Sequence, residues 1–204
     1  QNGEVRAENG VLENEFYRVR FDLHSGEIAE LYDLKQQKNI LSGSGAVPVV
    51  IDEFDRDTWS HGKNFFDDEI ARFTDAEVSV LENGPVRACI KVVSYYNKSV
   101  LTQYFMLEAG EQTLRVRASV DWQEKHKMLK LKFPMALTES TALYEIPFGM
   151  IERPADGEEE PGLMWVGVRG KEGAYALLNN NKYSFSVKDS TLALTVVRSP
   201  IYGD

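Results

Sequence analysis

The sequence predicts an all-β protein in which antiparallel strands pack as a large sandwich. Apolar and polar residues alternate with a period of two through most of the chain, and Gly, Pro, Asn and Asp separate the alternating runs. We count about a dozen such runs, more than one open sheet comfortably holds, so two packed sheets are the natural arrangement. No segment has the period of a long amphipathic helix.

The first predicted hairpin lies near the start of the chain. Residues 16–22 and 28–32 alternate apolar and polar side chains and flank the turn His24-Ser25-Gly26-Glu27. Gly26 can adopt the positive φ angle that such a turn requires. We therefore expect two antiparallel strands joined at this turn.

A second predicted hairpin surrounds an Asn-Gly pair. Residues 76–81 and 86–96 flank Glu82-Asn83-Gly84-Pro85, and Asn-Gly is a strong turn signal. Residues 100–107 then lead into another turn at Glu108-Ala109-Gly110-Glu111. Three consecutive strands are expected in this region.

The clearest alternation is in residues 112–122. One face of this strand carries five apolar side chains: Leu114, Val116, Ala118, Val120 and Trp122. Arginine, serine and aspartate occupy the opposite face. We expect the apolar face to be buried and the polar face to meet solvent or another element.

Residues 155–162 interrupt the strand pattern with the acidic run Glu158-Glu159-Glu160, and we predict a solvated loop there. A chain of 204 residues buries roughly 70% of its extended surface. We therefore predict a single domain over residues 1–204 with a self-sufficient core. Its other strands are predicted at residues 46–51, 128–137, 163–168, 173–178, 182–187 and 191–197.

The composition excludes several classes of partner. Hydrophobic residues make up 43% and charged residues 27%, as in ordinary globular proteins. No window holds the roughly 18 uninterrupted apolar residues of a membrane helix. The net charge of -9 argues against nucleic acid, whose binding depends on clustered Lys and Arg. We expect no membrane or nucleic-acid partner.

The sequence also offers no strong metal or thiol site. Cys89 is the only cysteine, so an intrachain disulfide and a cysteine zinc cage are excluded, and we interpret it as inert. His24, His61 and His126 are too far apart in sequence for local metal-ligand spacing. We predict no metal on this chain.

Four acidic side chains cluster at Asp52, Glu53, Asp55 and Asp57. A calcium loop would need Gly where Thr58 stands, and it would need a downstream bidentate Glu that is missing. A solvated loop is the favoured interpretation. A second one is that this segment, with Phe54 and Trp59, faces a sugar, because aromatic rings stack on pyranose C–H surfaces.

Paired carboxylates are the usual sign of a glycosidase, but 32 Asp and Glu residues make candidates plentiful. Glu145 and Glu152 stand out because they lie beside aromatic residues. Pairing of Glu152 with Arg153 or another neighbour, and a polar strand face for Glu145, explain them without catalysis. No Gly-rich phosphate loop, Gly-x-Ser-x-Gly elbow or Cys/His pair occurs. We predict no catalytic residue on this chain.

A distinctive segment is Tyr-Glu-Ile-Pro-Phe-Gly-Met-Ile-Glu-Arg-Pro at residues 144–154. This segment and several others, in the right order, resemble the carboxyl-terminal β domain of glycoside hydrolase family 38 α-mannosidases. The resemblance implies a large β domain like the supersandwich of galactose mutarotase-like proteins. The segments that carry it are residues 12–19, 26–28, 31–33, 120–127, 144–154, 176–183 and 197–200.

The resemblance implies that this chain is a fragment of a larger enzyme. Family members are retaining α-mannosidases that act on terminal mannosides with one divalent ion, usually zinc, and two aspartates in an upstream α/β domain. None of those motifs matches here, so the isolated chain is expected to be inactive. The implied partners are the upstream catalytic and helical domains of the same polypeptide and a mannose-containing saccharide. A cytoplasmic, bacterial-type enzyme, homo-oligomeric in its full-length form, is expected.

In this family, loops of the β half help to wall the substrate pocket. The first candidates for that role are Arg198, Tyr202 and Asp204 in the segment 198–204, followed by Tyr144 and Trp59. A strand-end ion pair is the alternative role for Arg198. After Pro154 the chain is acidic, where family members have an aromatic-containing insertion, which bears on substrate preference.

Two other functions are compatible with the residues. A self-standing carbohydrate-binding module would show exposed aromatics on one concave sheet face. A mutarotase-type epimerase would need His126 or His24 within reach of a sugar beside a Glu such as Glu145.

Overall fold

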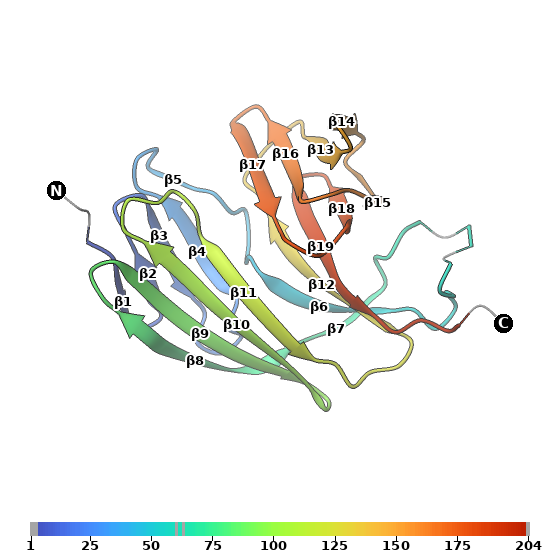
Figure 1. Ribbon diagram of the computed structural model, residues 1–204, viewed down its shortest axis with the longest axis horizontal. Helices are drawn as coiled ribbons and strands as arrows, with labels where there is room; N and C mark the ends of the chain where they lie inside the picture. The colour runs from blue at the N-terminus through green and yellow to red at the C-terminus, as the bar shows by residue number, and fades with distance from the viewer. Residues whose placement is uncertain (1–3, 60, 63, 203–204) are drawn as a thin grey trace. The chain divides into compact units, whose positions relative to one another are not determined.

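The structure consists of strands, turns and loops. The computed structural model describes residues 4–59, 61–62 and 64–202 (Figure 1). These residues contain nineteen strands in four antiparallel sheets and no helix, which confirms the predicted all-β antiparallel class. The described part of the chain accordingly has no helix of the length and apolarity needed to cross a membrane.

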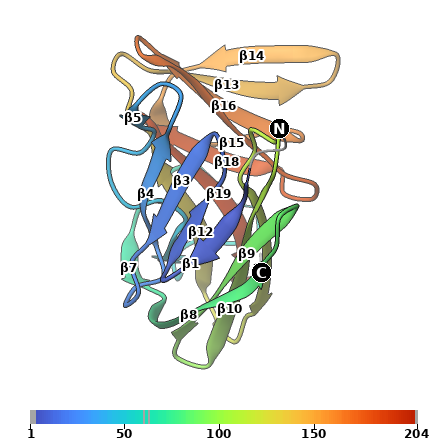
Figure 2. The ribbon, with the colours of Figure 1, turned by 90° about the vertical axis from the view of Figure 1, so that its left-hand side faces the viewer.

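The chain forms two compact units, each with two of the four sheets. Unit 1 contains residues 4–45 and 73–123. Phe21 and Phe105, one from each of its sheets, pack with ring centroids 4.8 Å apart. The first sheet has the strand order β1 (Arg6–Glu8), β2 (Val11–Glu13), β3 (Tyr17–Phe21), β4 (Ile28–Asp33), β5 (Lys38–Asn39) (Figure 2). The second has the order β11 (Arg115–Asp121), β10 (Ser99–Glu108), β9 (Arg87–Tyr96), β8 (Thr74–Asn83).

The predicted hairpins of unit 1 are present. β3 and β4 pair antiparallel around the turn at Gly26, whose φ is 74° and whose amide donates to the Asp22 carbonyl at 2.8 Å. A Cβ atom at Gly26 would lie 2.5 Å from Val92 Cγ1, so the position requires Gly for space as well as for conformation. β8 and β9 likewise pair on either side of the Asn-Gly turn.

The predicted buried face of residues 112–122 is wrong. β11 is the edge strand of its sheet, with a hydrogen-bonded neighbour on one side only. Val116 is 39% exposed, and most of the strand is exposed with it. Alternation identified the strand correctly, but it cannot tell an edge strand from a central one.

Unit 2 contains residues 46–72 and 124–202 among those described. Its two sheets meet where Tyr144 packs edge-on against Phe185, with ring centroids 6.4 Å apart. The larger sheet has the order β15 (Asp156–Pro161), β18 (Ser184–Lys188), β19 (Thr191–Arg198), β12 (Lys127–Pro134), β6 (Val47–Asp52), β7 (Glu69–Arg72). The smaller has the order β14 (Gly149–Arg153), β13 (Thr141–Ile146), β16 (Trp165–Gly170), β17 (Gly173–Leu178).

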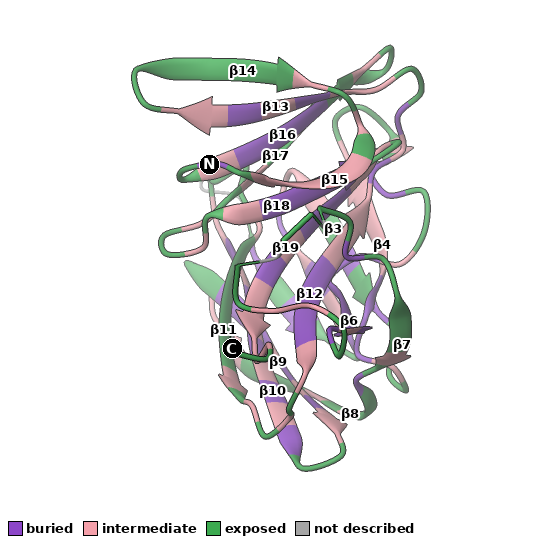
Figure 3. Ribbon diagram, turned by 90° about the vertical axis from the view of Figure 1, so that its right-hand side faces the viewer, coloured by how far each residue is buried: buried purple, intermediate pink, exposed green. Residues whose placement is uncertain are grey.

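The predicted solvated loop at residues 155–162 is also wrong, because these residues form β15 and pair with β18. The middle glutamate, Glu159, points into a largely buried site and pairs there with Lys130. Buried residues run along β12 and β16, whereas β14 is mostly exposed (Figure 3). Acidic composition therefore concealed a strand, the edge strand β15 of the larger sheet.

Candidate functional site

A long connection without strands joins β6 to β7 in unit 2. We call residues 53–68 the strap, of which residues 60 and 63 lie outside the described part. β6 and β7 form one edge of the larger sheet and β15 the other, yet the strap reaches β15: Asn64 Nδ2 donates to Glu158 Oε1 at 2.6 Å, and the Glu159 amide donates to the Asn64 carbonyl at 2.7 Å. The strap therefore crosses the sheet. Connections of this length are commonly functional.

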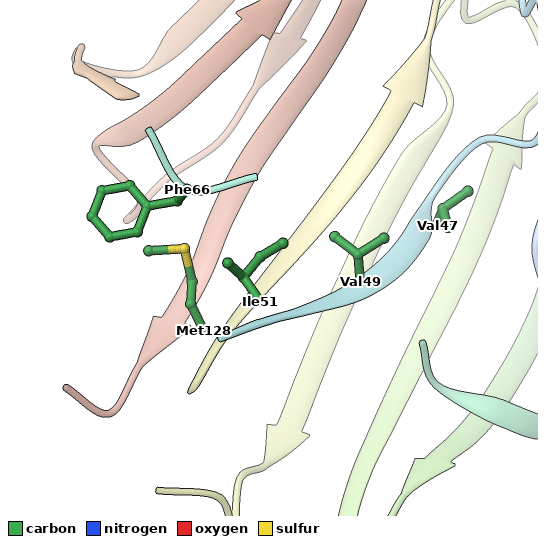
Figure 4. Close-up of a cluster of buried hydrophobic side chains, with 5 residues drawn as sticks. All are labelled: Val47, Val49, Ile51, Phe66 and Met128. Atoms are coloured by element: carbon green, nitrogen blue, oxygen red, sulfur yellow. The ribbon is translucent and has the colours of Figure 1, made fainter. Parts of the chain in front are cut away.

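The strap is held against the sheet by a cluster of buried apolar side chains around Phe66. Phe66 is buried in a cluster with four side chains from β6 and β12: Val47, Val49, Ile51 and Met128 (Figure 4). Burying a Phe side chain contributes roughly 1.5–3 kcal/mol. This cluster fixes the end of the strap nearest β7.

The beginning of the strap carries a buried ion pair. Glu53 is 0% exposed, its Oε1 accepts a hydrogen bond from Arg198 Nε at 2.7 Å, and the same oxygen lies 2.6 Å from Arg198 Nη2 in an ion pair. Burial raises the pKa of Glu53 above its ordinary value, although the Arg198 hydrogen bonds act in the opposite direction. The strand-end ion pair that was the alternative role for Arg198 is therefore present.

Two arginines share the Phe66 ring. The guanidinium carbons of Arg56 and Arg198 each lie 4.9 Å from the ring centroid, a cation–π geometry. Arg56 Nη1 also donates to the Asp52 carbonyl at 3.0 Å, and Arg198 Nη2 to the Asp57 carbonyl at 3.5 Å. Arg56, Glu53, Phe66 and Arg198 thus form one cluster.

His126 joins this cluster to the segment after β19. Its amide donates to the Ser199 carbonyl at 2.7 Å, and its carbonyl accepts from the Glu53 amide at 2.9 Å. The residue adopts a φ of 55°, and its ring meets the Phe54 ring edge-on at 5.7 Å. A left-handed conformation in a non-glycine residue is uncommon and marks this turn as a place where the backbone is constrained.

Two exposed aromatic side chains lie beside the cluster. The amide of Thr58 donates to the Ile201 carbonyl at 2.9 Å, so the strap and the segment after β19 run side by side. Trp59 follows Thr58 and is 70% exposed, and Tyr202 follows Ile201 and is 74% exposed. The structure therefore brings Arg198, Trp59 and Tyr202 into one region.

A carboxylate stands next to Trp59. Asp57 Oδ1 accepts from the Trp59 amide at 3.0 Å, and Asp57 Oδ2 lies 2.6 Å from His61 Nδ1. The hydrogen bond with His61 lowers the pKa of Asp57, so this side chain is an anionic acceptor at neutral pH. Such a group beside an aromatic ring suits a polyhydroxylated ligand.

The other two sequence candidates are not part of this region as described. Asp204 lies outside the described residues. Tyr144 lies on β13 and is buried between the sheets of unit 2, with the Arg153 guanidinium 4.7 Å from its ring centroid. Burial raises the pKa of Tyr144.

Three buried polar atoms of the site have no hydrogen-bond partner within the described part of the chain. They are Glu53 Oε2, Arg56 Nε and His126 Nδ1. No group of three or more His, Cys, Asp and Glu side chains able to hold a metal ion occurs among the described residues. The site can accept and donate hydrogen bonds, but it offers no metal-binding set there.

A second buried charge lies on the same sheet. Lys130 on β12 pairs with Glu159 and donates to Ser186 Oγ at 2.7 Å. Glu159 in turn accepts from Ser184 at 2.6 Å and from Thr195 at 2.5 Å. Burial lowers the pKa of Lys130. Sequence reasoning missed this group because Glu159 was assigned to a loop.

The two carboxylates that sequence singled out have local partners. Glu145 Oε2 accepts from the Met164 amide at 2.6 Å, and Glu152 Oε1 pairs with Arg169 Nη2 at 2.6 Å. Each of these carboxylates therefore has a hydrogen-bond or ion-pair partner within unit 2.

The glycosyl hydrolases family 38 C-terminal domain matches residues 12–204 of the sequence. The chain belongs to this family. Among curated proteins, the chain is 25% identical over 209 residues to alpha-mannosidase G of Dictyostelium discoideum, which covers 93% of the chain but 19% of that protein. It is 36% identical over 110 residues to human alpha-mannosidase 2C1, covering 50% of the chain and 11% of that protein. This family 38 C-terminal domain therefore spans a fifth or less of the relatives it matches.

Solved structures agree on the fold of the family 38 domain. The chain superposes on an alpha-mannosidase from Enterococcus faecalis V583 with a TM-score of 0.82 at 16% identity, covering 98% of the chain and 27% of that structure. A second Enterococcus faecalis structure, a protein of glycosyl hydrolase family 38, gives the same TM-score and identity. The arrangement of strands is shared although few residues are identical.

Proposed function

We propose that this chain is the β domain of a retaining, metal-dependent α-mannosidase that hydrolyses terminal α-mannosides. An upstream catalytic domain of the same polypeptide would supply the nucleophile, the acid/base carboxyl and one divalent ion, zinc by family resemblance. The observation that carries this proposal is the similarity to alpha-mannosidase G over 93% of the chain. The strap, with its exposed aromatic side chains, is the feature suited to wall a sugar site.

The walling role follows from the chemistry of the exposed side chains. Trp59 and Tyr202 offer apolar ring faces to pyranose C–H groups, and Asp57 offers a carboxylate to sugar hydroxyls. Arg198 and Asp204 are further candidates from the sequence. Tyr144, buried between the sheets, would act on the site only through packing.

The finer architecture and the setting of the enzyme belong to the same proposal. We take the four sheets as parts of a single supersandwich domain like that of galactose mutarotase, supported within each unit by the ring contacts between its two sheets. A cytoplasmic location and a homo-oligomeric enzyme are expected from the family resemblance. A crystal structure of the full-length polypeptide tests the supersandwich and the oligomeric state.

The first test uses the isolated chain. Titration of the isotope-labelled chain with methyl α-mannoside is expected to shift amide signals at Trp59 and Tyr202 and leave unit 1 unchanged. An aryl α-mannoside should not be hydrolysed, with or without zinc. Zinc-dependent turnover by the isolated chain would contradict the proposal, and so would saturable shifts confined to unit 1.

The second test uses the full-length polypeptide. Replacing Trp59 by Ala should raise KM for an aryl α-mannoside about ten-fold with a smaller change in kcat, because it removes a binding surface worth about 1.4 kcal/mol. Phe148→Ala is the matched control, because Phe148 is a fully exposed aromatic residue elsewhere in unit 2. Equal effects of the two substitutions would argue against a role of the strap.

A further inference from the structure

We propose that Glu53 is a positioning residue. Its buried carboxylate holds Arg198 and the start of the strap, and thereby keeps Trp59 and Tyr202 together as one ordered surface. The inference rests on the proposed function for the purpose of that surface. The positioning itself is a property of the chain and can be measured without sugar.

The first argument is the burial of the carboxylate. Glu53 is 0% exposed, whereas the Arg198 side chain is 26% exposed. Removing a carboxylate from water costs several kcal/mol, and a buried ion pair seldom returns more than it costs. Such a pair is therefore weak evidence for added stability. What it provides is geometry, because two guanidinium nitrogens converge on one oxygen, Oε1.

The second argument is that the pair sits where separate segments meet. Glu53 begins the strap and Arg198 ends β19, 145 residues away in sequence. Arg198 also reaches the Asp57 carbonyl, two residues before Trp59. The Arg198 guanidinium also contacts the ring of Phe66, which lies near the other end of the strap. One side chain therefore contacts the strap at three points.

The third argument concerns the backbone bonds on either side. The Glu53 amide donates to the His126 carbonyl, and the His126 amide donates to the Ser199 carbonyl. The Thr58 amide then donates to the Ile201 carbonyl next to Tyr202. Together with the Glu53–Arg198 pair, these bonds connect the strap, the turn at His126 and the segment after β19, which carry Trp59 and Tyr202. Loss of the pair would remove the side-chain link between these backbone bonds at Glu53 and those at Ser199 and Ile201.

The same geometry revises the role of Arg198. Sequence reasoning placed it as a candidate sugar contact. Its Nε and Nη2 atoms both contact the buried carboxylate, and its guanidinium carbon lies 4.9 Å from the Phe66 ring centroid. Arg198 therefore serves the site through the residues that it holds in place.

The test measures order in the isolated chain by NMR. Glu53→Gln is expected to shift the Arg198 Nε–H signal and to lower the backbone order parameters of Thr58, Trp59 and Tyr202 from about 0.85 to below about 0.6. Amides of β12 and β19 should stay ordered. Unchanged order parameters at Trp59 and Tyr202 in a folded Glu53→Gln variant would overturn the proposal.

Two arginine variants separate geometry from charge. Lys at position 198 keeps the positive charge but not the planar pair of donors, so Arg198→Lys should lose order as Arg198→Met does. Recovery of wild-type order by Arg198→Lys would show that charge balance alone is needed, and would overturn the positioning role.

Arg169→Met is the matched control, because it breaks an exposed ion pair of unit 2, that with Glu152, and leaves Glu53, Arg198 and Phe66 intact. It should not change order at Trp59 or Tyr202, and an equal loss of order there would overturn the proposal. If Glu53→Gln does not fold, the double variant Glu53→Met with Arg198→Met removes both partners of the pair and serves instead. Full order at Trp59 in that variant would equally refute the inference.

Sugar binding is read separately. Absence of shifts with methyl α-mannoside in the wild-type chain counts against the proposed function. The order parameters decide the positioning role independently, so the two failures can be told apart.

Discussion

The two units of this chain place their charged side chains differently. In unit 1 the ion pairs described lie at the surface, as in Glu82 with Arg87 and Glu13 with Arg6 and Arg18. In unit 2 two pairs are buried, Glu53 with Arg198 and Lys130 with Glu159. Surface pairs contribute little to stability, whereas a buried pair penalises the loss of either partner. Among the described pairs, the units therefore differ in whether an ion pair is buried, and loss of a partner should cost more in unit 2.

The buried polar contacts of unit 1 include a hub made by a neutral side chain. The buried Asn14 Nδ2 donates to the carbonyls of Glu108 at 3.0 Å and Glu111 at 2.9 Å. Its Oδ1 accepts from the amides of Phe16 and Tyr17, both at 2.9 Å. These hydrogen bonds do not depend on pH, because the amide side chain does not titrate. The contrast indicates that the buried charges of unit 2 serve more than packing.

The largest effect is expected from breaking a buried pair of unit 2. Lys130→Met fills similar space but leaves Glu159 without its cation, which should lower the free energy of unfolding of unit 2 by about 3–5 kcal/mol. Urea unfolding followed through the β12 amide signals measures it. The surface control in unit 1, Arg87→Met, should not move the urea midpoint of the β10 signals.

A double variant sharpens this prediction. Adding Glu159→Met to Lys130→Met removes the unpaired carboxylate and should restore most of the lost stability. If Lys130→Met alone costs no more than Arg87→Met, the distinction between the units fails.

A smaller loss is expected at the neutral hub of unit 1. Asn14→Ala leaves two carbonyls and two amides without their side-chain partner and should lower the free energy of unfolding of unit 1 by about 2 kcal/mol. Asn14→Asp keeps the acceptor but turns a carboxylate oxygen toward the Glu108 and Glu111 carbonyls, so it should be no milder. Urea unfolding followed at β10 measures both. A near-neutral Asn14→Asp would show that the donor half of the amide is unimportant.

Local patterns predicted the local parts of this structure. Alternation and Gly26 gave the β3–β4 hairpin, because both signals lie within a few residues of the turn. The acidic run around Glu159 led to the wrong prediction of a solvated loop, because the cation that pairs with Glu159, Lys130, is 29 residues away in sequence. In the same way, Arg198 and Trp59 were singled out separately, but the Glu53–Arg198 pair spans 145 residues and has no signature in sequence spacing. Long-range pairing of charges is visible only in the fold.

The smallest effect is a difference in how the units respond to acid. Burial raises the pKa of Glu13, but hydrogen bonds from Arg18 and Arg6 outweigh it, and the net pKa lies below the ordinary 4.5. The stability that Glu13 contributes is thus present above pH 4.5 and lost as the pH falls through its lower folded pKa. Glu53 has a folded pKa above 4.5, so it takes up its proton at higher pH, in a step that favours the folded state.

The sign of these shifts fixes the order of events in an acid titration followed by NMR. The Arg198 Nε–H signal should change while the pH is still above 4.5, without unfolding, because protonated Glu53 is a weaker acceptor. The Arg18 Nε–H signal should change only below pH 4.5, together with a loss of stability in unit 1. If Arg18 responds at the same pH as Arg198 or above it, the buried carboxylate of unit 2 is not distinguished by its environment, and the contrast between the units reduces to one of exposure.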